Sequence, residues 1–175
     1  MADIGYLDNN RVSGQTALPA GRPASIHCLM IPLSSDILLL PNAAIAEVVG
    51  YKNITMMVDT PSWFLGQLNW REQIVPVVSY EAAAGKEGGI KLNKASRVAI
   101  LNTLNGNRTL PYIGLLTQGI PHLQVVHPQA VTPGESADNN GLIGERVLIN
   151  GIAAVIPDMD ALEERVLAVI SSHPN

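Results

Sequence analysis

Four histidines and one cysteine are the residues of this 175-residue chain best suited to bind a metal, but their spacing argues against such a site. His27, His122, His127 and His173 show no metal-ligand spacing such as i, i+4 on a helix, and a single cysteine cannot complete a zinc set. His27 and Cys28 are neighbours in a strand-like stretch, so their side chains point to opposite faces. We therefore expect structural or solvated groups and no metal or cofactor.

Three acidic residues could suggest catalysis. Asp59-Thr60-Pro61 resembles the Asp-Thr-Gly of aspartic proteases, but such a site needs two carboxylates and a loop glycine, and here Pro61 replaces the glycine and no second copy exists. Asp158 and Asp160 immediately precede a C-terminal helix, where carboxylates complement the helix dipole. The sequence also lacks a glycine-rich phosphate loop after a strand, so we expect a non-enzymatic protein.

The composition narrows the classes of partner. Charged residues make up 15% of the chain, the net charge is −4, and 47% of the residues are hydrophobic. Without a basic stripe, nucleic-acid binding is not expected. We also expect no membrane insertion and a cytoplasmic location, because there is no secretory signal, no long apolar run and only one cysteine. So few charges favour an interaction protein, whose surface is largely neutral.

Short apolar segments joined by turn residues predict a mostly β fold. Residues 1–24 are polar, without periodicity, and we expect a flexible tail followed by a domain over 25–175. Hairpins are predicted at 25–41, at 64–78 around Arg71-Glu72-Gln73, and at 147–156 around Asn150-Gly151. One helix is predicted from about Asp160, with Asp160 and Glu163 forming a capping box and an apolar face made of Leu162, Val166, Val169 and Ile170. This pattern indicates a small barrel or a pair of barrels.

Two opposite charges lie in otherwise neutral stretches. Glu47 follows an Ala-rich turn and precedes two valines, while Arg71 comes directly after Trp70 at the predicted hairpin turn. Either charge could simply be solvated, and Trp63 and Trp70 could each be core residues or interface anchors. The two charges could also face each other and fix a surface.

The stretches around these charges, residues 38–49, 65–71 and 75–78, resemble the sequences of CheW-type adaptors. Residues 38–49 match its pattern of Leu-Pro before a short turn that ends in Val-x-Glu-Ile/Val, and residues 65–71 and 75–78 match its Gly-x-x-x-x-Arg-Gly hairpin and Pro-Val/Ile-Val strand. Order and spacing agree over 38–85 and more loosely over 112–119 and 144–162. Glu72 stands where the family usually has Gly, Ser79 where it usually has Asp, and Thr117-Gln118 replaces Val-Asp. The strings at 40–43 and 63–71 look more like ChpC-type proteins of type IV pilus (twitching) systems.

This resemblance implies an all-β fold of two small five-stranded barrels that share an aliphatic core, with short helical turns and one C-terminal helix. It implies an adaptor that binds a CheA-like histidine kinase and the cytoplasmic tip of a methyl-accepting chemoreceptor, without a cofactor. The partner-binding residues it suggests are Glu47, Arg71, Val49, Tyr51, Leu68 and Trp70. Two alternatives remain at this point: a small hydrolase that uses Asp59, and a ligand-binding β-barrel with a closed apolar pocket.

Overall fold

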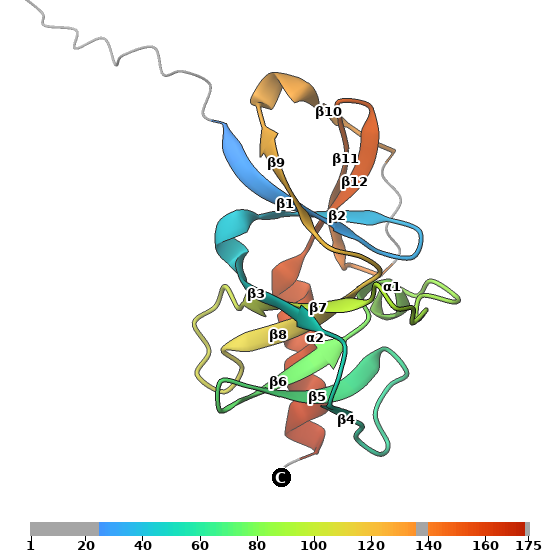
Figure 1. Cartoon of the computed structure of the whole chain (residues 1–175), viewed down its shortest axis with the longest axis vertical. Coiled ribbons are helices and arrows are strands. Elements are labelled where there is room, and N and C mark those ends of the chain that lie inside the picture. The colour runs from blue at the N-terminus through green and yellow to red at the C-terminus, as the bar shows by residue number, and fades with distance from the viewer. Residues whose placement is uncertain (1–24, 136–139, 174–175) are drawn as a thin grey trace, which may run out of the picture.

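Two six-stranded sheets form most of the protein in a computed structural model that describes residues 25–135 and 140–173 (Figure 1). The tail expected over residues 1–24 lies outside these described residues. Sheet A contains β1 (Ile26–Pro32), β2 (Ile37–Pro41), β9 (His122–Val126), β10 (Val131–Pro133), β11 (Ile143–Ile149) and β12 (Ile152–Pro157). Sheet B contains β3 (Ile45–Gly50), β4 (Ile54–Thr55), β5 (Phe64–Trp70), β6 (Gln73–Val78), β7 (Arg97–Asn102) and β8 (Tyr112–Thr117). The helical elements are η1 (Asn42–Ala44), α1 (Tyr80–Ala83), η2 (Pro128–Ala130) and α2 (Met159–Ser172).

The predicted all-β class with one C-terminal helix is confirmed, although each sheet has six strands and not five. The difference comes from β4 and β10, which have only two and three residues. Strands this short show no periodicity in the sequence, so the pattern of apolar residues could not reveal them. All three predicted hairpins are present, as β1–β2, β5–β6 and β11–β12.

Both sheets have the same topology. Sheet A follows the order β10-β11-β12-β2-β1-β9 and sheet B, read from its other edge, the order β4-β5-β6-β8-β7-β3. In each sheet the third and fourth strands are parallel and all other neighbours are antiparallel. Sheet B comes from the middle of the chain, whereas sheet A combines the first two strands with the last four. Sheet A is therefore a circular permutation of sheet B.

Each sheet curves into an incompletely closed barrel because its two edge strands are consecutive in the chain. In sheet B, β3 and β4 are separated by residues 51–53, and in sheet A, β9 and β10 are separated by residues 127–130. Three or four residues span at most about 3.3–3.6 Å each, so the edges of each sheet must lie near one another. We call the two rolled sheets barrel A and barrel B.

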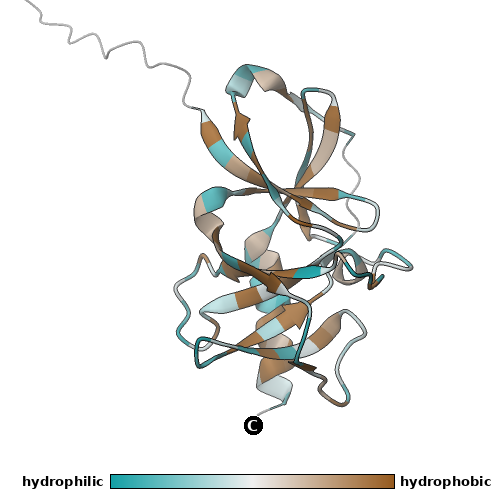
Figure 2. Cartoon of the chain, viewed as in Figure 1, coloured by the Kyte–Doolittle hydropathy of each residue, from teal (hydrophilic) through white to brown (hydrophobic). Residues whose placement is uncertain are grey.

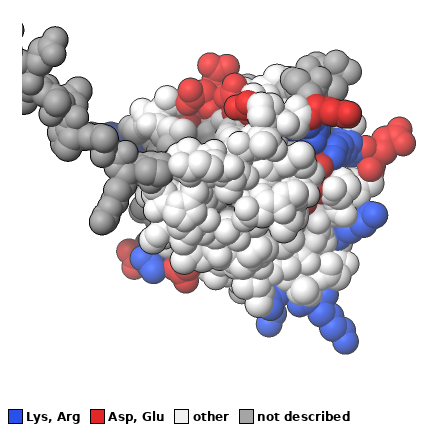
Figure 3. Space-filling model, turned by 90° about the horizontal axis from the view of Figure 1, so that it is seen from above, with Lys and Arg blue, Asp and Glu red and all other residues white. Residues whose placement is uncertain are grey.

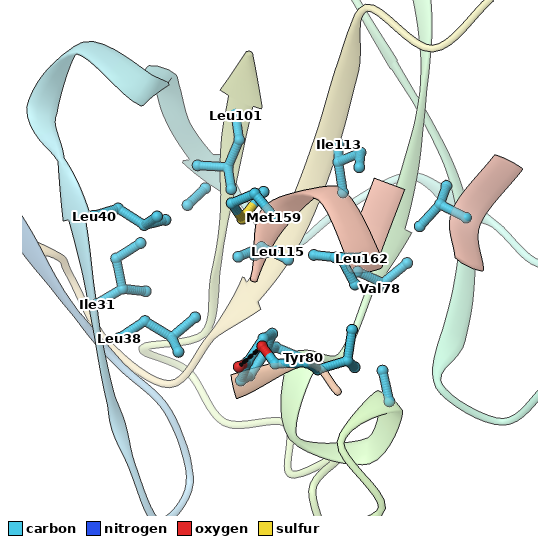
Figure 4. Close-up of a cluster of buried hydrophobic side chains, with 14 of the residues drawn as sticks. Ile31, Leu38, Leu40, Val78, Tyr80, Leu101, Ile113, Leu115, Met159 and Leu162 are labelled. Carbon is cyan, nitrogen blue, oxygen red and sulfur yellow. Dashed lines mark hydrogen bonds between the residues drawn. The ribbon is translucent and has the colours of Figure 1, made fainter. Parts of the chain in front are cut away.

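A shared aliphatic core joins the two barrels, as the family resemblance implied. Figure 4 shows Ile31, Leu38 and Leu40 of sheet A facing side chains of sheet B, with Met159 and Leu162 of α2 beside them. Hydrophobic residues follow the strands, and hydrophilic residues gather mainly in the connections (Figure 2). The buried face of α2 also includes Val166 and Val169, as the helical spacing predicted. Burial of this face holds α2 against both sheets.

Two buried glutamates connect the barrels in a reciprocal way. Glu81 of α1, which follows sheet B strand β6, accepts the backbone N–H groups of Ser34 and Ser35 in the β1–β2 turn, both at 2.7 Å. Glu163 of α2, which follows sheet A strand β12, accepts the Leu104 N–H in the β7–β8 loop at 2.6 Å. Each glutamate is 2% exposed. In each barrel, the helix that follows the third strand of the sheet therefore fixes a strand connection of the other barrel.

The predicted capping box of Asp160 and Glu163 is wrong. Glu163 does not cap the start of α2, and we call its contact with the β7–β8 loop, and that of Glu81 with the β1–β2 turn, the two glutamate clamps. Helix α2 begins at Met159, and Asp158 caps it by accepting the Ala161 N–H at 3.0 Å. The Glu163 carboxylate bonds to the distant Leu104 N–H and to the side-chain amide of Asn105 at 2.9 Å. Asp158 already caps the helix start, so a hydrogen bond to Glu163 there would add little stability. Without Glu163, the partly buried Leu104 N–H would lack a partner among the described residues, so hydrogen bonds to Glu163 from this N–H and from the Asn105 amide stabilise the fold more.

We expect Glu163→Ala to lower the free energy of unfolding by about 2 kcal/mol, because it removes the charged acceptor of the partly buried Leu104 N–H and of the Asn105 side-chain amide. Urea unfolding at neutral pH measures this loss. Glu164→Ala is the matched control, since Glu164 lies on the exposed face of the same helix and should change stability little. Equal unfolding free energies for the two variants would contradict the role of Glu163 as a clamp.

Candidate functional site

The β11–β12 hairpin of barrel A and the β5–β6 hairpin of barrel B occupy corresponding places, but they carry different side chains next to the turn. In barrel A, Ile149 is the last residue before the β11–β12 turn and is 1% exposed within an apolar interior. The corresponding residue of barrel B is Trp70, the last residue before the β5–β6 turn, and it is only partly buried. Barrel B thus ends in an accessible aromatic residue with polar neighbours where barrel A ends in aliphatic packing.

Glu47 organises this end of barrel B. Its Oε2 accepts a hydrogen bond from the indole Nε1–H of Trp70 at 3.0 Å and another from the Arg71 guanidinium at 2.8 Å. Because Glu47 lies on the edge strand β3 and Trp70 on β5, this one oxygen links two strands that are not neighbours in sheet B. The expected proximity of Glu47 and Arg71 is confirmed.

Aromatic contacts fix the orientation of Arg71. Its guanidinium carbon lies 4.7 Å from the centroid of the Trp70 ring, a cation–π distance. On β8, Tyr112 packs edge-on against Trp70, with ring centroids 5.0 Å apart and an interplanar angle of 75°. The Arg71 side chain is nevertheless 69% exposed and that of Glu47 39% exposed. The site therefore presents an ordered but accessible guanidinium.

The turn that carries Arg71 has an unusual backbone. The connection between β5 and β6 has two residues and not the expected three, with φ of +48° at Arg71 and +63° at Glu72. Positive φ at both central positions is the type I′ geometry of two-residue hairpins, which favours Asn-Gly. The corresponding turn of barrel A has that sequence, Asn150-Gly151. Arg71 and Glu72 adopt the same geometry with side chains that disfavour it.

The other residues suggested as partner-binding contact the interior of barrel B in different environments. Val49 and Tyr51 are partly buried and pack against its interior, and burial raises the pKa of the Tyr51 hydroxyl above its ordinary value. Leu68 needs a correction, because it is 6% exposed and belongs to that interior. Alternation along β5 turns Leu68 inward with Trp70, and only Trp70 reaches the open end. Leu68 can support the hairpin but offers no surface.

The candidates for catalysis and metal binding lie apart from this site. Asp59 is exposed in a turn with φ of +58°, and Asp158 is the cap of α2. His27, His122 and His127 are exposed, and His173 lies at the end of α2. Within residues 25–135 and 140–173, no three His, Cys, Asp or Glu side chains are grouped as metal ligands. The helices of this part of the chain are too short or too polar to cross a membrane.

Two residues of the site were not identified from the sequence. Tyr112 contributes an edge-on ring from a strand 42 positions after Trp70, and no local pattern connects the two. Glu72 was noted only as a departure from a family glycine. Its backbone geometry could have been predicted from the length of the connection. Two residues between paired strands favour a type I′ or II′ turn whatever their identity.

Comparisons with known proteins agree with this architecture. The family model described as a CheW-like domain matches residues 27–166. The chain is 23% identical over 139 residues to the chemotaxis protein CheW of Klebsiella aerogenes, a match that covers 74% of this chain and 80% of that protein. Its fold matches the crystal structure of the scaffolding protein TtCheW from Thermoanaerobacter tengcongensis with a TM-score of 0.65 and 19% identity, over 80% of this chain and 88% of the other.

We expect Glu72→Gly to stabilise the protein by about 1 kcal/mol, because glycine accepts a positive φ without the steric cost of a side chain. For a chain of this size the gain corresponds to a rise in Tm of about 2–4 °C, measurable by calorimetry. Gly151→Ala in the corresponding turn should lower Tm, since Gly151 has φ of +83°. A fall in Tm for Glu72→Gly would show that the Glu72 side chain stabilises the turn.

Proposed function

The chain belongs to the family of CheW-like domains, and from this premise we propose that it couples a methyl-accepting chemoreceptor to a CheA-like histidine kinase. The proteins of this family are non-enzymatic scaffolds, and a CheW-like scaffold acts in chemotaxis signalling. We propose the same for this chain: it binds both partners and catalyses no reaction.

The observation that carries this proposal is an exposed guanidinium held in one orientation. Arg71 is bonded to Glu47, lies over Trp70 and still exposes 69% of its side chain. An ion pair this exposed contributes only about 0–1 kcal/mol to folding, so stability is a poor explanation for it. An ordered Arg can instead offer several N–H donors to a carboxylate or carbonyl of a protein partner, with less loss of side-chain entropy on binding.

An adaptor needs a second surface, and sheet A offers large exposed apolar side chains. Ile26 of β1 is 54% exposed, Leu123 of β9 56% and Ile152 of β12 49%. Figure 3 views the end of the molecule formed by sheet A, where uncharged residues fill the centre and charged ones lie around the margin. We assign one partner to the Arg71 site and the other to sheet A.

Signal transfer would then depend on how the adaptor positions its two partners and not on a reaction that it catalyses. The shared core and the two glutamate clamps hold the barrels in a fixed relation. A partner bound at the Arg71 site and another bound at sheet A would therefore be kept in one geometry. A shift of the receptor then changes kinase output through its differential contacts, as linkage between two binding sites requires.

We expect Arg71→Ala to leave Tm nearly unchanged while weakening the association by about 2 kcal/mol, roughly thirtyfold in Kd. Calorimetric titration with the regulatory domain of the kinase, and separately with the receptor tip, measures the loss. Lys94→Ala is the control, because Lys94 is an exposed cation just before β7, at the end of β7 and β8 opposite to Tyr112 and Trp70. Unfolding of Arg71→Ala, or unchanged binding of both partners, would refute the role of Arg71.

Glu47→Gln separates direct contact from positioning. Its amide oxygen can still accept the Trp70 N–H, but the ion pair with Arg71 is lost. Weaker binding by this variant would mean that Glu47 acts by orienting Arg71. Unchanged binding would mean that Arg71 meets the partner without this support. Exchange of the two charges is a less clean test, because Arg at position 47 would face the indole N–H with another donor.

The similarity of residues 63–71 and 40–43 to ChpC-type proteins leads us to propose a type IV pilus system as the setting. In a host with both flagella and pili, deletion of the gene should abolish twitching motility and leave swimming chemotaxis intact. Swarm-plate and subsurface twitching assays measure the two phenotypes. Complementation with wild-type protein should restore twitching. Loss of swimming chemotaxis with normal twitching would instead place the adaptor in the flagellar system.

A further inference from the structure

The backbone of the β5–β6 turn carries a larger steric cost than the corresponding turn of barrel A. Arg71 and Glu72 are consecutive non-glycine residues with positive φ, and the corresponding β11–β12 turn meets the same requirement with Asn150-Gly151. The two turns have the same length and the same place in matching sheets. A glycine at position 72 would therefore fit the fold, and the carboxylate at this position needs another explanation.

The Glu72 carboxylate is the unneutralised charge of the turn. The guanidinium of Arg71 is already paired with Glu47 at 2.8 Å, so these two charges cancel. Glu72 is exposed, and among the described residues none forms a hydrogen bond or ion pair with its carboxylate. The tip of barrel B therefore presents one net negative charge to solvent.

An exposed apolar side chain accompanies this charge on the hairpin. Ile74, two positions after Glu72, is 52% exposed and lies opposite Asn69 on the outer face of β5–β6. Residues 69 and 71–74 are all exposed, so the tip projects from the barrel. A carboxylate next to an exposed isoleucine suits a protein surface with a cation beside an apolar group.

We propose that Glu72 binds a Lys or Arg side chain of the protein partner that docks at the Arg71 site, with Ile74 packing beside that contact. This inference rests on the proposed adaptor function and adds the chemistry of the partner: it must present a basic residue at the position facing the turn. Binding of that cation offsets the conformational cost of Glu72. Glu72 thus lowers the folding stability of the free protein and strengthens its binding to the partner.

Two substitutions of Glu72 separate charge from backbone strain. Glu72→Gln removes the charge and keeps a side chain at positive φ, whereas Glu72→Gly removes both. Binding to the kinase regulatory domain and to the receptor tip from the same genome is measured by titration calorimetry at 50 and 300 mM NaCl. For the partner of the Arg71 site, both variants should bind about fivefold more weakly at low salt. The difference from wild type should shrink at high salt, because salt screens exposed charges.

Two control variants address the remaining explanations. Glu164→Gln removes a negative charge from the exposed face of α2 and should bind like wild type. Gly151→Glu places a strained glutamate in the matching turn of barrel A and should lower Tm without changing the affinity for the partner of the Arg71 site. Weaker binding by Glu164→Gln would mean that net charge alone matters, and would overturn the proposal.

The other outcomes are equally distinct. If wild type binds a partner and Glu72→Gln binds it equally well at both salt concentrations, Glu72 meets no cation and this inference is wrong, while the adaptor function stands. If only Glu72→Gly binds more weakly, rigidity of the turn and not charge is required, and the inference is again wrong. If wild type binds neither partner, the proposed function fails and the inference fails with it.

Discussion

The two ends of the chain must meet for this fold to exist. Sheet B forms from residues 45–117, but sheet A is completed only when the N-terminal hairpin pairs with the C-terminal strands, through the parallel contact of Leu38 with Val155. The shared core and the clamp of Glu81 on the β1–β2 turn need that hairpin in place. Contacts between positions this far apart carry a large loop-closure cost, so the buried aliphatic core must supply the offsetting stabilisation.

The candidate site lies in sheet B, the sheet that forms without pairing between the two ends of the chain. The β5–β6 hairpin belongs to the continuous sheet, and its tip projects beyond the interior that Leu68 helps to fill. The tip is held by local contacts: one Glu47 oxygen accepts from Trp70 and Arg71, and Tyr112 packs against the indole. The tip can therefore carry a strained backbone and an unpaired carboxylate while the core stays intact. These features make it suited to recognition.

Local patterns in the sequence predicted the hairpins, the Asn150-Gly151 turn and the apolar face of the C-terminal helix. The opposite charges of Glu47 and Arg71 in neutral stretches suggested that they face each other, and the family resemblance led to two barrels around one core. Contacts without a local signal were missed: Glu163 was assigned to a capping box because its spacing from Asp160 fits one, yet it binds a loop 59 residues away. The same limit applies to Tyr112 beside Trp70. Leu68 was suggested as partner-binding by the family resemblance, although alternation along β5 turns it inward.

The most direct test of the account uses the chain's two tryptophans as internal probes. Trp70 donates its indole N–H to Glu47 at the proposed binding site, whereas Trp63 lies at the other end of β5–β6 and packs against the shared core. In ¹H–¹⁵N spectra, titration with the kinase regulatory domain or the receptor tip should shift or broaden the Trp70 indole signal and leave that of Trp63 in place. Saturable binding with an unchanged Trp70 signal would contradict the account.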